Sequence, residues 1–152
     1  MIELIDEAFT APSWHGPSLL GSIRGLTETE ASWRPGKERH NIWELAVHAA
    51  YWKYIVRRRL TGQRKERFPA KGSNWFVRPS KGRTWKEDVG LLVEQHERLR
   101  DVVVHFPQSA LTRPVGNGRQ TAGYVIRGIA AHDLYHAGQI RLLKRLQSGG
   151  PE

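Results

Sequence analysis

The sequence predicts an all-α fold, a four-helix bundle of the antiparallel type with one long crossover between its second and third helices. Apolar residues recur at helical spacing in four segments, and alternating runs of β-branched residues are missing. The chain has 152 residues, with no internal repeat and no low-complexity tract. We therefore expect residues 1–152 to form a single domain with its own apolar core.

The first predicted helix covers residues 2–26 and is broken, because proline and glycine interrupt it between residues 12 and 17. Its stronger half is predicted over residues 18–26, where leucine and isoleucine recur at helical spacing. A connector follows over residues 27–40. Pro35 disfavours the α conformation of the residue before it, so we do not extend a helix through this connector.

The second predicted helix begins after Asn41, which is a good helix cap, and Glu44 three residues later comes close to a capping box. Gly62 ends this helix. Residues 63–83 are rich in glycine, proline, lysine and arginine. A segment of this length without secondary structure is usually a functional lid, a long crossover or a mobile loop.

The third predicted helix begins at Thr84, where Glu87 completes a capping box, and Pro107 stops it. The fourth covers residues 121–147, after a loop over residues 108–120. Both helices have an inward seam with the alternating spacing of four and three residues that is typical of bundle helices.

The composition restricts the chemistry available to the protein. The chain contains no cysteine, which excludes disulfides, thiolate nucleophiles and cysteine-ligated zinc, so any metal site must use His, Asp or Glu. Lysine and arginine together number 24 against 15 acidic residues, and this net charge of +9 favours anionic partners. No apolar run approaches the roughly 18 residues that span a bilayer. The acidic first residues do not fit a secretory signal, so we expect a cytoplasmic protein without membrane association.

Two histidines of the fourth predicted helix lie on its inward seam. His132 and His136 are four residues apart, so they project from one face of the helix and can share a metal ion. His48 lies on the apolar stripe of the second predicted helix, between Leu45 and Trp52. Each imidazole on an inward seam takes the place of an apolar side chain and so costs apolar burial. Three such histidines on two helices therefore favour a shared metal site over three isolated core histidines.

Three imidazoles leave further coordination positions open. Structural zinc sites usually have four protein ligands, whereas three ligands with an open position are typical of catalytic sites. An all-nitrogen set suits several divalent ions, of which zinc and nickel are favoured and Fe(II), Mn and Co are alternatives. The pKa of a water bound to such an ion is lowered toward neutrality, so that it can act as a nucleophile.

Three residues near this predicted site are candidates for catalytic proton transfer. Glu44 lies one turn before His48 and could accept its second ring N–H, although the role of helix cap is favoured. His96 is a further seam histidine, on the third helix, and could be an extra ligand, a general base or a buried core residue. His15 lies at the break in the first helix and could line the open end of the bundle.

Other side chains are candidates for substrate contact or for helix packing. Gln139 occupies a seam position, where its amide could orient a substrate or bridge two helices. Trp52 could line a pocket, although aromatic residues at such positions more often belong to the core. Asp133 could be a surface charge or the partner of a neighbouring helix. The candidate substrate-binding residues are Trp52, Gln139 and Tyr135. We interpret as structural the two histidines that flank helix ends, His40 and His105.

The chain resembles the DinB-like, or YfiT-like, superfamily in two segments. Residues 131–140, AHDLYHAGQI, resemble its last-helix motif, and residues 42–52, IWELAVHAAYW, are similar to its second-helix motif. The resemblance implies a four-helix bundle whose long link is residues 63–83, frequent homodimers, and a divalent metal ion held by His48, His132 and His136. Members with assigned activity include thiol S-transferases that use bacillithiol, mycothiol or glutathione, a maleylpyruvate isomerase and metal-dependent hydrolases.

These observations leave three classes of function open. The favoured class is a metal-dependent enzyme acting on a small molecule, either a thiol S-transferase that uses a low-molecular-weight thiol or a hydrolase. A second class is non-specific nucleic-acid binding through the basic run Arg57–Lys71, which no recognised DNA-binding motif accompanies. A third is a bundle in which a metal ion only stabilises the fold.

Overall fold

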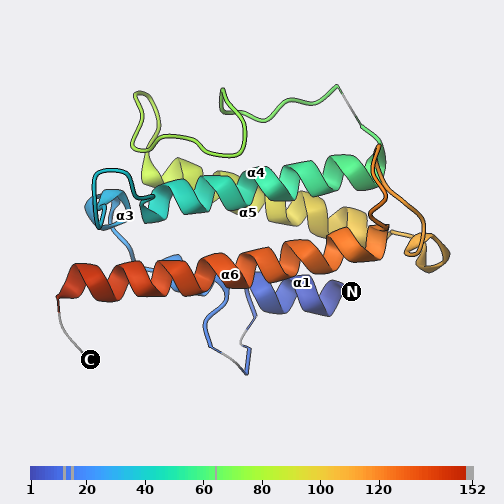
Figure 1. Ribbon diagram of the computed structural model, residues 1–152, viewed down its shortest axis with the longest axis horizontal. Helices are drawn as coiled ribbons and strands as arrows, with labels where there is room; N and C mark the ends of the chain where they lie inside the picture. Colours follow the sequence, from blue (N-terminus) through green and yellow to red (C-terminus); the bar gives the residue numbers. More distant parts are fainter. Residues whose placement is uncertain (12, 15, 64, 150–152) are drawn as a thin grey trace.

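The computed structural model describes residues 1–11, 13–14, 16–63 and 65–149, and over these residues the protein is all-α, as predicted (Figure 1). Three long helices build most of the bundle: α4 (Ile42–Thr61), α5 (Trp85–Val104) and α6 (Ala122–Ser148). The shorter elements are α1 (Ile2–Phe9), α2 (Leu19–Ile23), α3 (Glu28–Ser32) and the 3-10 helix η1 (Gln108–Ala110). In the described part of the chain, no helix is both long and apolar enough to cross a membrane.

The long crossover sets the direction of the helices. After α4 the chain returns along the outside of that helix before α5 begins, so α4 and α5 are parallel, while α1 and α6 have the opposite direction (Figure 1). The predicted crossover between the second and third predicted helices, which are α4 and α5, is therefore confirmed. The bundle differs from a purely antiparallel one, because a connection that spans a whole helix length restarts the next helix at the same end.

The first predicted helix is broken into α1 and α2, as predicted. The prediction that the second piece would be the stronger helix was wrong. The longer piece is α1, which has 8 residues and buries Ile5, Ala8 and Phe9. The later piece, α2, has only 5 residues and ends before Gly25, whose φ of +76° is a left-handed conformation that glycine adopts readily.

The predicted connector over residues 27–40 contains a short helix, so the prediction without a helix was wrong for its first half. In α3 the Thr27 side chain accepts a hydrogen bond from the Glu30 N–H, and the Glu30 carboxylate accepts one from the Thr27 N–H. This reciprocal capping box explains how so short a helix forms. After Trp33 the chain is no longer helical, as Pro35 predicts.

The boundaries of the three long helices follow the predicted caps closely. Asn41 caps α4 by accepting a hydrogen bond from the Glu44 N–H at 2.8 Å, and Gly62 ends that helix with a φ of +70°. Thr84 and Glu87 form the predicted capping box of α5. Thr121 caps α6, and α5 ends two residues earlier than the predicted seam did, at Val104.

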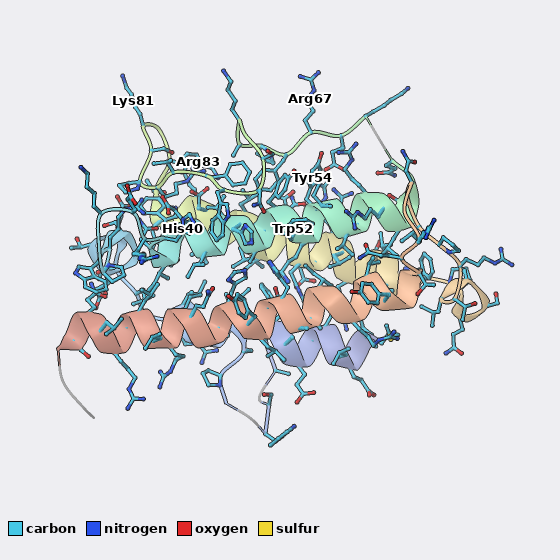
Figure 2. The ribbon with its side chains drawn as sticks, in the orientation of Figure 1. His40, Trp52, Tyr54, Arg67, Lys81 and Arg83 are labelled. Atoms are coloured by element: carbon cyan, nitrogen blue, oxygen red, sulfur yellow. The ribbon has the colours of Figure 1, made fainter. Side chains whose placement is uncertain are left out.

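Two clusters of buried apolar side chains join the helices. The first cluster includes Trp43 and Leu92 and joins α4 and α5 to the C-terminal half of α6. The second cluster includes Leu99 and Ile126 and joins α1 and α5 to the N-terminal half of α6. Side chains fill the space between α4 and α6, as Figure 2 shows. Polar side chains also lie among them, including three imidazoles that face one another: His48 and His136 are buried, and His132 is half-buried.

Candidate metal centre

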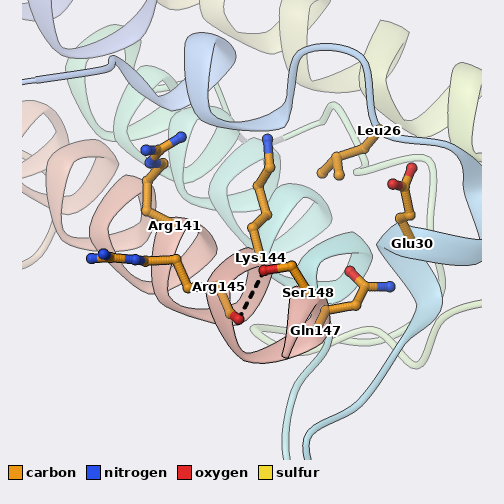
Figure 3. A pocket seen from close by; sticks show the side chains of 7 residues that line it. All are labelled: Leu26, Glu30, Arg141, Lys144, Arg145, Gln147 and Ser148. Atoms are coloured by element: carbon orange, nitrogen blue, oxygen red, sulfur yellow. Dashed lines mark hydrogen bonds between the residues drawn. The ribbon is translucent and has the colours of Figure 1, made fainter. Parts of the chain in front are cut away.

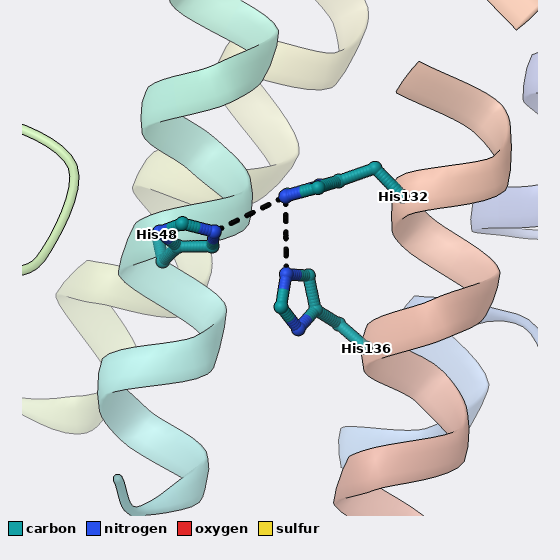
Figure 4. Close-up of side chains that lie close together, drawn as sticks. All are labelled: His48, His132 and His136. Carbon is teal, nitrogen blue, oxygen red and sulfur yellow. Dashed lines mark hydrogen bonds between the residues drawn. The ribbon is translucent and has the colours of Figure 1, made fainter. Parts of the chain in front are cut away.

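Three histidines meet between α4 and α6 (Figure 4). His48 projects from α4, and His132 and His136 project from successive turns of α6. The Nε2 atom of His132 lies 3.1 Å from Nε2 of His48 and 3.0 Å from Nε2 of His136. In the described part of the chain this is the one group of three or more His, Asp or Glu residues close enough to hold a metal ion. The structure thus brings together the three histidines that the sequence selects.

Hydrogen bonds fix which nitrogen carries the proton in two of these rings. His48 Nδ1 lies 2.7 Å from the carbonyl oxygen of Asn74, which can only accept, so Nδ1 is protonated and Nε2 carries a lone pair. His136 Nδ1 lies 2.6 Å from Oε1 of Gln139. The amide nitrogen of Gln139 donates to the hydroxyl oxygen of Tyr135, so Oε1 is the acceptor and His136 Nε2 also carries a lone pair.

His132 shows why a cation fits this arrangement. Its Nε2 faces two lone pairs and can offer at most one proton, so a neutral triad leaves at least one of these lone pairs without a donor. Its Nδ1 is buried without a hydrogen-bond partner among the described residues. A cation that receives all three lone pairs removes this conflict. Nitrogens about 2.1 Å from one ion would be about 3.0–3.4 Å apart for angles between a right angle and the tetrahedral value, and the two distances at His132 lie at the short end of this range.

Burial keeps the three imidazoles neutral. Removal from water, together with the neighbouring His136 and His48, lowers the pKa of His132 to about 3. Burial likewise lowers the pKa of His136 to about 4, against the opposing effect of Gln139. The pKa of His48 is lowered by burial as well, although the Asn74 carbonyl acts in the opposite direction. Neutral imidazoles are the form that binds metal ions.

The crossover supplies one wall of this site, which the sequence analysis missed. Asn74 has a φ of +64°, a left-handed conformation that asparagine tolerates better than most residues, and its side chain accepts the indole N–H of Trp52 at 2.9 Å. The indole of Trp75 stacks on the ring of His48 with centroids 3.9 Å apart and an interplanar angle of 11°. The only signal in the sequence is an asparagine–tryptophan pair within a flexible-looking segment.

Glu44 does not contact His48, so the predicted hydrogen bond between them is not formed. The Asn74 carbonyl occupies that position at His48. Nor does the Glu44 carboxylate complete a capping box: Asn41 alone caps the helix by accepting the Glu44 N–H, while the Glu44 carboxylate binds other partners. It accepts hydrogen bonds from Arg34 and from the main-chain N–H of Arg78, and it lies 2.8 Å from Nδ1 of His40.

His96 lies in the core, away from the three histidines. Its ring stacks on Phe9 with centroids 3.8 Å apart, and its Nε2 is 3.8 Å from the carboxylate of Asp6. Burial lowers its pKa to about 3, and the charge of Lys53 adds to the effect. Among the alternatives weighed for His96, the buried core residue describes its position. The remaining proton-transfer candidate, His15, lies outside the described residues.

Asp133 is the partner of a neighbouring helix. Its carboxylate forms an ion pair with Lys53 of α4, and both side chains are 1% exposed. Burial raises the pKa of Asp133 to about 6 and lowers that of Lys53, and in each case the other charge opposes the shift. The lysine that completes this pair was not selected from the sequence, although it stands within the buried part of the second predicted helix.

A cavity of about 490 Å³ opens beside the three histidines, and His136 forms part of its wall. Two of the three predicted substrate-binding residues, Gln139 and Tyr135, also line it. Trp52 does not line it; its ring packs edge-on against His48 and at a tilt against His132 instead. The apolar residues of the wall are Pro35, Leu45, Trp75, Leu142, Leu143 and Leu146, and its remaining polar residues are Arg39 and His40.

A second hollow, of about 330 Å³, lies near the C-terminal end of α6 and is shown in Figure 3. Arg141, Lys144 and Arg145 contribute three cationic side chains to it. Cations are favoured at this end of a helix because the helix dipole is negative there. Lys144 also donates a hydrogen bond to the Ser22 carbonyl at 3.2 Å. Helix stabilisation therefore accounts for these residues.

The comparisons with known proteins agree with this geometry. No curated protein and no solved structure gives a significant match. The family model of the DinB superfamily matches residues 13–140, which includes all three histidines and the crossover. Because this match covers most of the chain, the protein belongs to the DinB superfamily.

Proposed function

We propose that the protein is a metal-dependent enzyme that acts on a small organic molecule. The observation that carries this proposal is the convergence of three imidazole lone pairs beside an open cavity, with no fourth protein ligand among the described residues. Sites with three protein ligands and an open position are typical of catalysis, whereas structural sites are usually closed. The all-nitrogen donor set favours zinc or nickel, with Fe(II), Mn and Co as alternatives.

The chain's own residues have separate roles in this proposal. His48, His132 and His136 would hold the ion, which supplies a coordinated water or thiol of lowered pKa as the nucleophile. Asn74 and Gln139 keep the two Nδ1 atoms protonated and so direct the Nε2 lone pairs inward.

The cavity indicates the kind of molecule that would react. Leucine side chains of α6 and the indole of Trp75, which lines the cavity, offer an apolar surface to the body of a ligand. Arg39 stands at the same cavity with no ion-pair partner among the described residues, and the net charge of +9 adds to its attraction for carboxylates. An anionic low-molecular-weight thiol with an apolar electrophile, or an ester or amide, fits these features. The two reactions we propose are therefore thiol S-transfer and hydrolysis.

The alternative of nucleic-acid binding has less support. Within the basic run Arg57–Lys71, Arg57 is only 5% exposed and is ion-paired with Glu66 at 2.7 Å. Arg59 donates a hydrogen bond to Gln120, so part of this run serves contacts within the chain. A buried, paired guanidinium is a poor phosphate ligand, because it must lose its partner first.

The test begins with metal content. Untagged protein, loaded in parallel with Zn, Ni, Mn and Fe(II), is analysed by mass spectrometry for bound metal, together with His136→Ala and the control His105→Ala. His105 is an exposed histidine at the end of α5, so its loss leaves the triad intact. We expect about one ion per chain in the native protein and the control, and none in His136→Ala.

Turnover is then measured with the loaded protein, using glutathione with 1-chloro-2,4-dinitrobenzene for thiol transfer and 4-nitrophenyl acetate for hydrolysis. Metal-dependent turnover of either probe supports the proposal. Failure to bind any of the four ions would refute it. Metal binding without turnover, combined with unfolding on chelation, would instead support the purely structural role.

A further inference from the structure

His40 and Glu44 form a carboxylate–imidazole pair at the start of α4. Nδ1 of His40 lies 2.8 Å from Oε2 of Glu44. The Glu44 side chain is 4% exposed and the His40 side chain 46%, so the carboxylate is fixed inside while the imidazole reaches the surface of the cavity. A carboxylate accepts, so Nδ1 is the protonated nitrogen. Nε2 of His40 has no hydrogen-bond partner among the described residues.

The carboxylate of Glu44 is held charged and rigid by groups other than His40. Arg34 donates to both of its oxygens, and the main-chain N–H of Arg78 donates to Oε1 at 3.1 Å. Burial alone would raise the pKa of Glu44, but the hydrogen bonds from Arg34, His40 and Arg78 outweigh it, and the net pKa is lowered. The residue thus provides a permanent negative charge behind the imidazole.

Trp75 places His40 beside the three histidines. The indole stacks on His40 with centroids 3.7 Å apart and an interplanar angle of 7°, and its other face stacks on His48. One indole ring therefore separates His40 from a metal-binding imidazole. His40 and His136 line the same cavity, so both face a ligand bound there. The interpretation of His40 as merely structural does not account for this arrangement.

We propose that His40 is the proton-transfer residue of this site and that Glu44 is its positioning residue, an inference that rests on the proposed function. As the oxygen of water or the sulfur of a thiol bonds to the electrophilic carbon of the ligand, Nε2 of His40 takes the proton from that O–H or S–H. The bond from this carbon to the leaving group breaks with its electron pair, and Nε2 returns the proton to the leaving group. Glu44 holds the tautomer and stabilises the imidazolium that forms in between.

The first test measures the nucleophilicity of Nε2 and needs no turnover. 4-Bromophenacyl bromide alkylates an imidazole when Nε2 attacks its CH₂ carbon, with loss of bromide and one proton. Peptide mass spectrometry follows the rate at His40 and, as internal control, at His105, which is more exposed (76%) and places Nδ1 against a main-chain carbonyl at 2.9 Å. The carboxylate of Asp101 is also near His105, but at 3.5 Å and 77% exposed, so it is a weaker partner.

We expect His40 to react faster than His105 despite its lower exposure. Glu44→Gln removes the charge behind His40 and should slow alkylation there by about tenfold, because a hydrogen bond to a charged group is worth more than a neutral one. The rate at His105 should not change. Equal or faster alkylation at His105, or an unchanged rate at His40 in Glu44→Gln, would overturn the pairing.

The second test separates this inference from the proposed function. Metal content, kcat and KM are measured for the loaded native protein, His40→Asn, Glu44→Gln and the control His105→Asn, with the thiol-transfer and ester probes. We expect kcat of His40→Asn to fall by about 100-fold or more. KM and bound metal should remain unchanged, which a general loss of structure would not allow. Unchanged kcat in His40→Asn would overturn the inference while the proposed function stands. If the native protein turns over neither probe, the proposed function fails and the alkylation rates alone decide whether the pair is activated.

Discussion

Replacement of Gln139 by leucine should weaken metal binding without unfolding the bundle. Oε1 of Gln139 accepts the Nδ1 proton of His136 at 2.6 Å, and leucine has a similar volume but cannot accept. In the variant the proton of His136 is free to move to Nε2, and an imidazole protonated there cannot bind the ion through that atom. Gln139 occupies a half-buried seam position of α6, where leucine packs well, so the metal-free variant should be as stable as the native protein.

The size of this effect follows from the hydrogen bond that is lost. A neutral hydrogen bond contributes about 0.5–1.5 kcal/mol net, which corresponds to roughly a twofold to thirteenfold change in affinity. Loss of a group that orients a metal-binding histidine typically costs about 10–100-fold. The two ranges overlap near tenfold, or about 1.4 kcal/mol, which is the value we expect.

The assay is a competition titration of zinc between the protein and a chromophoric chelator. Gln147→Leu is the matched control, because it makes the same exchange on the same helix at a position without contact to the triad. Gln139→Glu keeps an acceptor and should bind zinc at least as tightly as the native protein. Native affinity in Gln139→Leu would show that Gln139 does not determine the tautomer of His136.

Two further predictions concern buried titratable side chains outside the triad. His96→Leu should reduce the pH dependence of the free energy of unfolding. In the native protein the folded-state pKa of His96 is about 3, so below about pH 6.5 the unfolded chain binds a proton that the folded chain does not. The native protein therefore loses stability as the pH falls from about 6.5 to about 3, and the variant lacks this loss. Between pH 7.5 and pH 5 the loss due to His96 is about 2 kcal/mol in the free energy of unfolding, which urea titrations measure. An equal pH dependence in the native protein and in His96→Leu would contradict the burial of His96. Lys53→Met should cost about 3–5 kcal/mol because it leaves Asp133 buried without its partner, so that the carboxyl must take up a proton or stay charged and unpaired, whereas the double variant with Asp133→Leu should cost much less. A cost of less than about 1 kcal/mol for the single variant would show that the ion pair contributes little.

The features that could be predicted from the sequence are those with a local cause. The caps at Asn41, Thr84 and Thr121 act within one helical turn, so they locate the helix starts directly. The seam positions of His132 and His136 follow from helical periodicity alone, and His48 follows in the same way on α4.

The features that were missed depend on contacts between distant segments. Asn74 and Trp75 belong to a crossover without periodicity, so nothing in their spacing indicates that they would cover His48. The pair His40–Glu44 had a readable signal, since the two residues are four apart. It was overlooked because His40 precedes the helix cap and was treated as belonging to the connector. The sequence spacing offers Glu44 as a helix cap or as a partner of His48, and only the folded crossover shows that a main-chain carbonyl occupies the place at His48.

The parallel arrangement of α4 and α5 gives the crossover more chain than its span requires. The 20-residue helix α4 is about 30 Å long, a distance that about ten extended residues would cover. The segment from Gly62 to Thr84 has about twice that number of residues. The extra length allows Asn74 and Trp75 to reach His48 although the segment runs along the outside of α4 (Figure 1). Residues 71–73 are exposed, so we expect insertions there to change the approach to the cavity, whereas Phe76 and Arg78 are buried and Glu66 pairs with Arg57 of α4 and Arg98 of α5. The exposed part of the crossover is thus a place where the choice of ligand can change while the helices that carry the three histidines stay the same.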